Sequence, residues 1–274
     1  MTLVDTHAHL DFADDVEGWI ERAKADGVNK IICVGTSVEA SKKCCDIANE
    51  HSSDDLRIYA TVGIHAQDGK GDIKKYGSLL SCYITLKQTA ESSDKVVAVG
   101  ECGFDFKVTS DKLQVISDKE KKFQKELFEA QIRLAAELNL PLVVHCRNAW
   151  EETFDLLRKF STRSNSKLRG LFHSWTGNWE AAQKALDLDF YISFSGIVTF
   201  KNAPEVQQLA GKMPLDRMLL ETDSPFLTPE PFRGKTNEPK NVKIVAEFIA
   251  RLRDLPADRL ADVTSKNAER LFGF

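Results

Sequence analysis

Short apolar runs alternate with longer amphipathic segments along almost the whole sequence, and this rhythm restricts the folds open to the chain. Eight runs have the length and composition of β-strands: Leu3–Thr6, Lys30–Val34, Arg57–Val62, Val96–Gly100, Leu142–His145, Gly170–Phe172, Phe190–Ser193 and Met218–Leu220. Apolar residues at helical spacing predict helices over Val16–Asp26, Val38–Glu50, Lys74–Ser92, Lys119–Leu138, Trp150–Ser161, Trp179–Leu186, Pro204–Lys212, Asn241–Arg253 and Ala257–Leu271. Strands that alternate with helices form a parallel sheet covered by helices.

Eight strand–helix units in 274 residues favour an α/β fold of the closed (β/α)8 TIM barrel type, with one domain over residues 1–274. The alternative is an open doubly wound sheet. Against it, no G-x-G-x-x-G follows the first strand, and Gly100 and Gly103 flank Glu101 without forming that fingerprint. We expect Asp118 to cap the helix that follows it and Pro141 to end that helix.

Composition says more about the compartment than about the substrate. A net charge of −4 and a pI near 5.9 lack the general basic footprint of a non-specific nucleic-acid binder, but they allow a nuclease whose cations sit in one cleft. No apolar run approaches the roughly 20 residues that span a bilayer, so we expect no membrane partner. Met1 leads directly into the first strand without a secretion signal, and six cysteines show no C-x-x-C spacing. We therefore expect a cytoplasmic protein without disulfides.

Two histidines close to the start of the chain are the first candidates for chemistry. His7 and His9 are two residues apart at the end of the first strand, so their side chains point to the same face. Two imidazoles on one face can share a divalent metal ion. Alone, the pattern equally fits a pair of half-buried or surface histidines.

Other ligand-type residues also fall at the ends of predicted strands: His65, Glu101, His145, His173 and Asp223. Only His51 is off this pattern, and we interpret it as a surface residue. A barrel builds its active site at the carboxyl ends of its strands, so these side chains should converge. Buried carboxylates and imidazoles are costly unless they are paired or coordinated, which indicates a bound cation or a catalytic network.

Six motifs in the same order resemble the TatD-type metal-dependent DNases of the amidohydrolase superfamily. They are VDTHAHLDF at 4–12, VGIHA at 62–66, VGECGFDF at 99–106, VVHCRNA at 143–149, FHSW at 172–175 and LLETDSPFL at 219–227. Phe104 and Phe106 depart from the family, which more often has Leu and Tyr there. The resemblance covers nearly the whole chain and implies a (β/α)8 barrel with a two-metal centre.

The resemblance also implies a role for each ligand. His7, His9 and Asp223 would hold one ion, His145 and His173 the second, and Glu101 would bridge the two. Imidazoles and carboxylates suit Zn²⁺, Mn²⁺ or, with fewer nitrogens, Mg²⁺. Two ions about 3.5–4 Å apart can bind the attacking and leaving oxygens of a phosphodiester. We expect Asp223 to accept the proton of the attacking water, although it would also be a ligand.

Three cationic residues are candidates for binding phosphate. Arg233 and Lys235 lie in the segment PEPFRGKTNEP at 229–239, which resembles a family loop and otherwise is a proline-stiffened surface loop. Arg147 is the third candidate; its alternative is an ion pair with a local carboxylate. His65 resembles the family's G-I-H motif, with Ala66 in place of the usual Pro, and we expect it near the scissile phosphate. Cys102 and Cys146 should face away from the metals as core thiols.

Three functions remain open on these grounds. The first is a DNase of the 3′–5′ exonuclease type that uses two divalent ions and acts on single-stranded DNA or 3′ ends. The second is a metal-dependent hydrolase of carboxylic esters or amides, such as an aminoacyl-tRNA deacylase, on the same centre. The third is a non-catalytic metal-binding or scaffold protein. A monomer is one option for the assembly.

Overall fold

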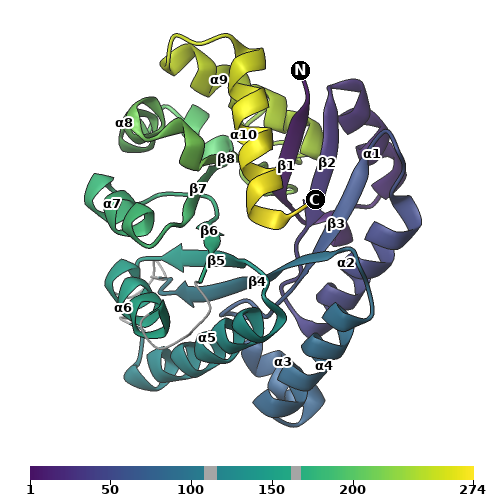
Figure 1. Ribbon diagram of the computed structural model, residues 1–274, viewed down its shortest axis with the longest axis vertical. Coiled ribbons are helices and arrows are strands. Elements are labelled where there is room, and N and C mark those ends of the chain that lie inside the picture. Colours follow the sequence, from purple (N-terminus) through teal and green to yellow (C-terminus); the bar gives the residue numbers. More distant parts are fainter. Residues whose placement is uncertain (108–115, 162–167) are drawn as a thin grey trace.

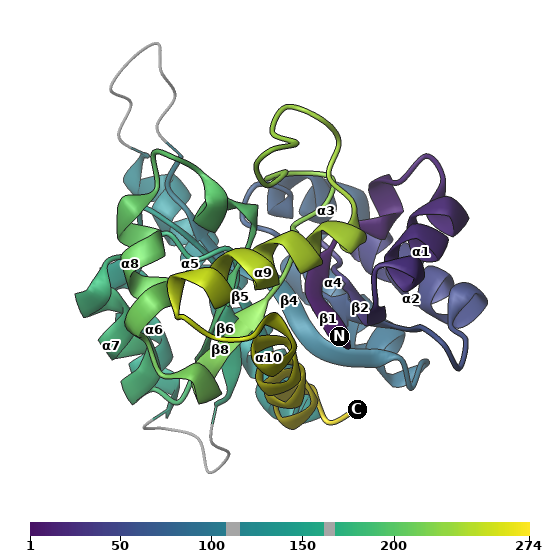
Figure 2. The same ribbon diagram turned by 90° about the horizontal axis from the view of Figure 1, so that it is seen from above.

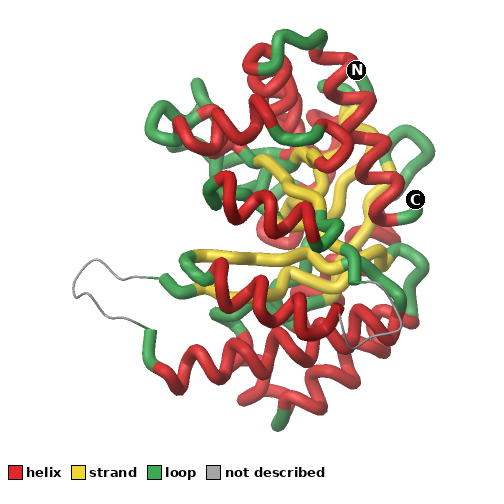
Figure 3. The backbone as a smooth tube through the Cα atoms, turned by 60° about the vertical axis from the view of Figure 1, so that its left-hand side comes forward, coloured by secondary structure: helices red, strands yellow, loops and turns green. Residues whose placement is uncertain are grey.

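Eight parallel strands form a nearly closed barrel in the computed structural model, which describes residues 1–107, 116–161 and 168–274. The strands follow one another around the barrel in chain order, and the helices lie outside them (Figures 1 and 3). This arrangement confirms the (β/α)8 TIM barrel predicted from the alternation of strands and helices.

Within the described residues, the strands are β1 (Leu3–Ala8), β2 (Val28–Cys33), β3 (Arg57–Val62), β4 (Val96–Asp105), β5 (Leu142–Arg147), β6 (Gly170–Phe172), β7 (Tyr191–Phe194) and β8 (Met218–Leu220). The α-helices are α1 (Val16–Ala25), α2 (Val38–His51), α3 (Gly69–Tyr76), α4 (Leu79–Glu91), α5 (Asp118–Leu138), α6 (Trp150–Ser161), α7 (Trp179–Asp187), α8 (Pro204–Lys212), α9 (Val242–Leu252) and α10 (Ala257–Phe272). None of these helices is long and apolar enough to cross a membrane.

Most predicted helices differ from the observed ones by no more than a residue at either end, but the single helix over 74–92 and the cap of α5 were predicted wrongly. The segment 74–92 belongs to two helices, α3 and α4, because Gly77 adopts φ +86° and ends the first, and the Ser78 side chain accepts a hydrogen bond from Ser81 N to cap the second. Ser117, not Asp118, caps α5: its hydroxyl accepts from Glu120 N. Asp118 is already in the first turn of the helix, where its negative charge interacts favourably with the positive end of the helix dipole.

Three strands, β1, β4 and β5, run at least two residues further at their carboxyl ends than predicted, and this changes where the polar residues lie. His7 and Glu101 lie inside β1 and β4 instead of after them, and His145 lies inside β5 instead of at its last residue. The ladder between β4 and β5 continues through these residues, with Gly103 opposite His145. The carboxyl ends of these strands therefore carry the polar side chains, although the pairing shifts register next to His7 and Glu101.

The barrel closes between β1 and β8 through a few specific bonds instead of a full ladder. Ala8 and Ser224 form an isolated parallel bridge, in which His9 N donates to Ser224 O at 2.8 Å. One step earlier, the buried carboxylate of Asp5 accepts from Thr222 N at 2.9 Å and from the Thr222 hydroxyl at 2.6 Å. The first and last strands are thus joined directly beside the polar residues.

Helix α10 covers the opposite end of the barrel. Its Asn267 side chain donates to Leu215 O and Met218 O, both at 2.9 Å, where β8 begins. Its Leu271 and Phe272 pack with the apolar barrel interior. The amino ends of the strands are therefore filled, and the loop after β8 lies on the side of the barrel away from α10 (Figure 2).

Candidate metal centre

His7, His9 and Asp223 form the first group of ligand-type side chains. The imidazoles come from the end of β1, and their Nε2 atoms lie 3.3 Å apart. Asp223 Oδ1 lies 3.5 Å from His7 Nε2 and 3.3 Å from His9 Nε2. All three side chains are buried, and their ligand atoms converge on one point.

Asp223 reaches this group because the backbone turns sharply after β8. Its φ is +58°, in the left-handed region that Asp tolerates better than most residues other than glycine. Its N–H donates to His7 O at 2.8 Å. This bond fixes the turn against β1 and holds the carboxylate beside both imidazoles.

Glu101, His145 and His173 form the second group. Glu101 Oε1 lies 2.8 Å from His145 Nδ1 and 2.9 Å from His173 Nε2. The two ring nitrogens lie 3.0 Å apart. These side chains extend from β4, from β5 and from the end of β6, and all are buried.

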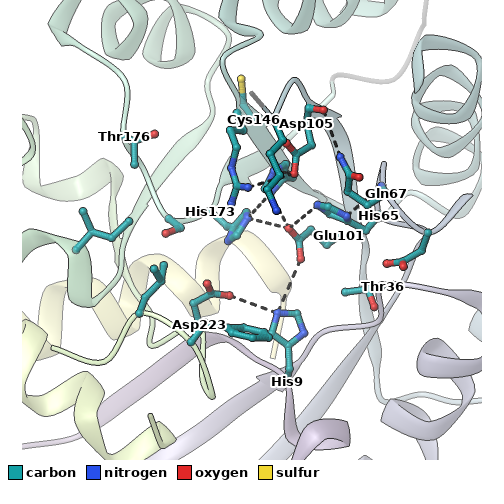
Figure 4. A pocket seen from close by; sticks show the side chains of 18 of the residues that line it. His9, Thr36, His65, Gln67, Glu101, Asp105, Cys146, His173, Thr176 and Asp223 are labelled. Carbon is teal, nitrogen blue, oxygen red and sulfur yellow. Dashed lines mark hydrogen bonds and ion pairs between the residues drawn. The ribbon is translucent and has the colours of Figure 1, made fainter. Parts of the chain in front are cut away.

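The carboxylate of Glu101 belongs to both groups, each through a different oxygen. Whereas Oε1 faces His145 and His173, Oε2 lies 3.4 Å from His7 Nε2 and 3.9 Å from His9 Nε2. Figure 4 shows this carboxylate at the centre of the cluster, with His173 on one side and His9 on the other. A carboxylate placed in this way can bridge two cations.

Two glycines let Glu101 approach β5 so closely. A Cβ at Gly100 would lie 2.5 Å from Val143 O, and one at Gly103 would lie 2.0 Å from His145 O. Both residues also have positive φ values, +150° and +145°, which residues with a Cβ rarely adopt. The glycines around Glu101 in the sequence are therefore required by the packing of β4 on β5.

The spacing of the donor atoms fits divalent metal ions. A tetrahedral ion with bonds of about 2.0–2.1 Å separates its ligand atoms by about 3.4 Å, and the contacts within the first group are 3.3–3.5 Å. Octahedral ligands at similar bond lengths are about 2.9 Å apart, and the contacts within the second group are 2.8–3.0 Å. Mixed imidazole and carboxylate donors suit zinc or manganese.

Further carboxylates and a carbonyl lie behind three of the imidazoles. Asp105 Oδ2 lies 3.5 Å from His145 Nε2, and Glu221 Oε1 lies 3.5 Å from His173 Nδ1. His9 Nδ1 lies 3.2 Å from Val34 O. Each partner favours the ring tautomer that leaves the other nitrogen free for a metal ion.

The pKa values of the clustered side chains are set by burial and by the charged groups close to them. Burial opposes charging of His9, but the hydrogen bond and negative charge of Asp223 prevail and raise the pKa of His9 to about 9. Burial likewise opposes ionisation of Glu101, yet His173, His65 and His145 hold the pKa of its carboxyl well below its usual range. An ion would therefore meet ionised carboxylates and would displace protons from imidazole.

His65 stands at the edge of the second group. Its Nε2 lies 3.7 Å from Glu101 Oε1, and its ring contacts that of His145 edge to face. Burial lowers the pKa of His65 to about 4, so the ring is neutral at pH 7. The side chain faces the open cavity and is available to a substrate, although its role near a phosphate stays a prediction.

The two groups lie at the base of a cavity of about 660 Å³. Its lining includes the cationic residues Arg147 and Lys107 and the apolar residues Phe12, Phe226, Ile197 and Leu227. Arg147 Nη1 lies 3.5 Å from Asp105 Oδ2, so the local ion pair predicted as an alternative is present while the arginine also lines the cavity.

Arg233 and Lys235 do not line this cavity. Both are exposed on the loop after β8; the Arg233 guanidinium lies 4.0 Å from the centre of the Phe200 ring, and Lys235 Nζ lies 5.5 Å from that of Phe232. Their predicted contact with phosphate would therefore be made outside the cavity, on a strand that extends beyond it.

The structure brings all six predicted ligands into one cluster and adds residues that the sequence reasoning did not assign. Asp105, Glu221 and Lys107 stood in or next to recognised motifs without a role. A usable signal was present for the two carboxylates, because an acidic residue at the end of a buried strand needs a partner. His51, at the end of α2, lies outside the cavity lining.

Of the two cysteines beside the ligands, Cys102 is the core thiol that was predicted, whereas the same prediction is wrong for Cys146. Cys102 is fully buried in the core, and Cys146 is half-buried, with its sulfur accepting a hydrogen bond from the Thr153 hydroxyl at 3.4 Å. Cys146 also contributes to the cavity lining. All six cysteines are free, as predicted.

Comparison with known proteins agrees with this geometry. The model of the family described as TatD related DNase matches residues 4–273. The uncharacterized metal-dependent hydrolase YabD of Bacillus subtilis is 39% identical, over 98% of each chain. The uncharacterized metal-dependent hydrolase YcfH of Escherichia coli is 36% identical, over 99% of this chain and 96% of its own.

A solved structure supports the same relationship. The crystal structure of the TatD homolog YJJV from Escherichia coli superposes with a TM-score of 0.85 at 28% identity. The match covers 99% of this chain and 98% of that one. The similarity thus extends over the whole barrel.

Proposed function

Because the chain belongs to the TatD-related DNase family of metal-dependent hydrolases, we propose that it hydrolyses phosphodiester bonds of DNA with two divalent ions. The observation that carries this proposal is the position of Glu101. Its two oxygens face separate groups of imidazoles, at 2.8–2.9 Å on one side and 3.4–3.9 Å on the other. One ion in each group would share this carboxylate.

The residues around the two groups supply the remaining functions. Two divalent ions such as Mg²⁺, Mn²⁺ or Zn²⁺ would polarise the phosphate and lower the pKa of a water molecule. Asp223, whose carboxyl pKa is kept below its usual value by the neighbouring imidazoles despite burial, is ionised and can accept the proton of that water. His65, neutral and facing the cavity, can donate a hydrogen bond to a phosphate oxygen.

Cations at the mouth favour a polyanionic substrate although the whole chain is acidic. Arg147 and Lys107 line the cavity, and Arg233 and Lys235 are exposed on the adjoining loop. A strand whose terminal phosphate lies over Glu101 would extend past these side chains. We therefore favour cleavage near a 3′ end of single-stranded DNA by a cytoplasmic enzyme.

A second candidate is hydrolysis of a carboxylic ester, as in an aminoacyl-tRNA deacylase. The Arg147–Asp105 contact favours it, because one of the two cations lining the cavity is already partly neutralised. The same metal centre would polarise an ester carbonyl as readily as a phosphate.

Release of nucleotides from 5′-labelled single-stranded DNA, in Mg²⁺, Mn²⁺ or Zn²⁺, tests the proposal. We expect the wild type to shorten the labelled DNA step by step. EDTA should stop this shortening, and the Glu101→Ala variant should not shorten the DNA. Turnover of an aminoacyl ester without shortening of DNA in any metal would favour the second candidate. Neither reaction in any metal would favour a scaffold role.

A further inference from the structure

Two phenylalanine rings are exposed at the rim of the cavity. Phe12 is 54% exposed and Phe226 is 51% exposed, whereas most phenylalanines in the described part of the chain are buried. Leaving an aromatic ring in water forfeits the favourable free energy of burying it. Adjacent exposed rings at the entrance of a cavity therefore call for a ligand that covers them.

The two rings come from opposite ends of the sequence and meet beside a predicted metal ligand. Phe12 follows β1 and Phe226 follows β8, and the closure of the barrel places their ring centres 6.0 Å apart, edge to face. Each ring also contacts the imidazole of His9, at 5.8 Å for Phe12 and 5.9 Å for Phe226. We define these two rings as the aromatic platform.

The platform faces the cavity on the side of the first ligand group. Ile197 and Leu227 add apolar surface to the same lining, while Arg147 and Lys107 are its cationic residues. A ligand that fits this arrangement has a negatively charged group beside a flat apolar group. A nucleotide combines the two, since its base lies one sugar away from its phosphate.

From this arrangement we infer that Phe12 and Phe226 bind the unpaired terminal base of the substrate strand by stacking. The inference rests on the proposed nuclease function. Because the rings already touch edge to face, no slot is open between them, and the base lies across their exposed faces. A base in a duplex is stacked on its neighbours and cannot reach the platform, so the strand end must be unpaired. Stacking tolerates every base, so the enzyme does not select sequence.

Comparison of two oligonucleotides tests the inference. One is a single-stranded DNA with a 3′-terminal adenine, and the other has an abasic sugar at the same position. We expect the wild type to prefer the adenine substrate by roughly 5- to 100-fold in kcat/KM, mostly through KM. Phe12→Leu and Phe226→Leu keep apolar bulk but remove the ring, and they should lose most of this preference for adenine over the abasic sugar.

Phe274→Leu is the matched control, because it makes the same change at the end of the chain, where the ring stacks on Tyr59 and Phe272 beside α10. It should keep the full preference for adenine. Equal use of both substrates by the wild type, or an unchanged preference in both platform variants, would overturn the inference while leaving the nuclease function standing.

Binding alone separates failure of the inference from failure of the proposed function. A DNA with 2-aminopurine at its 3′ end, mixed with wild type in EDTA, should lose fluorescence on stacking, and the loss should be smaller in the platform variants. If the protein hydrolyses no DNA but this quenching is present, the nuclease proposal fails and the platform stands as a base-binding site. If quenching is absent or equal in all variants, the platform inference fails.

Discussion

Asp105 holds the imidazole of His145 from behind, with 3.5 Å between Asp105 Oδ2 and His145 Nε2. The other ring nitrogen lies 2.8 Å from Glu101 Oε1. One ring is thus fixed between an outer carboxylate and the carboxylate at the centre of the cluster. In the two-ion arrangement proposed above, the effect of Asp105 on an ion would pass through His145.

Replacing Asp105 should weaken one ion site and spare the other. We expect Asp105→Ala to lower the metal affinity of the second group by about 10- to 100-fold, since the outer partner of a histidine ligand orients the ring. Asp105→Asn should restore part of it. Calorimetric titration of the metal-free wild type should show two binding steps, and His173→Ala should lack the step that belongs to the second group. In Asp105→Ala only that step should weaken. Equal weakening of both steps would contradict the assignment.

The two ligand groups should be separable by metal content. His7→Ala and His173→Ala should each retain one ion per chain where the wild type retains two, because each removes a ligand from a different group. Glu101→Ala should lower the affinity of both, since its oxygens face both groups. Elemental analysis after gel filtration reports the content. A wild type with a single ion would disprove the two-ion proposal.

Metal binding should release protons. In the ion-free protein the raised pKa of His9, about 9, keeps its ring charged at pH 7, and a ligand nitrogen must be neutral. Affinity should therefore rise with pH up to about 9. The same shift adds stability to the ion-free protein below the unfolded pKa of about 6.5, and this is lost as pH rises through about 9.

Calorimetry in buffers with different ionisation enthalpies measures this release. The apparent binding enthalpy should differ between phosphate and Tris, and His51→Ala, outside the cavity, should behave as wild type. The same enthalpy in both buffers would mean that no proton leaves.

Arg233→Ala should weaken DNA binding without loss of metal. The side chain is exposed and outside the cavity, so its expected contribution is contact with a phosphate of the extended strand. The slope of log binding constant against log salt concentration should become shallower by about one, which corresponds to the loss of one phosphate contact. Fluorescence anisotropy at several salt concentrations, with metal content measured in parallel, checks this. Loss of metal in this variant would show that the loop supports the centre itself.

Gly103→Ala should destabilise the fold. A Cβ there would lie 2.0 Å from His145 O, at a φ of +145°. Strain and overpacking together should cost at least about 2 kcal/mol. Gly71→Ala is the control, because a Cβ there meets nothing within 4 Å and should stabilise α3 by up to about 1 kcal/mol. Denaturant unfolding compares the two; equal stability would mean that β4 shifts away from β5.

Periodicity was enough to predict the barrel, because each strand and helix has its own local pattern. Trp150–Ser161, Arg57–Val62 and Met218–Leu220 have the predicted bounds. The errors fall where a local alternative competes, as at Gly77, or where polar residues continue a strand, as from Glu101 to Asp105. In the latter case only pairing with β5 reveals that the strand goes on.

The sequence was enough to predict the candidate ligands of the site but not the residues that surround them. Ligand residues follow from their residue type at strand ends, which is a local property. The pairing of Asp105 with His145 and the contact between Phe12 and Phe226 depend on distances between separate elements. Such contacts exist only once the barrel closes, so no pattern within one segment could indicate them.

The order of synthesis gives the closure of the barrel a consequence in time. His7 and His9 leave the ribosome first, but Asp223 follows only after β8 has been made. The second group is complete in sequence once His173 has emerged. A nascent chain therefore carries two of the three side chains of its first group through most of its synthesis. An ion that needs all three could bind there only after Asp223 had been made, which would couple metal uptake to completion of the chain.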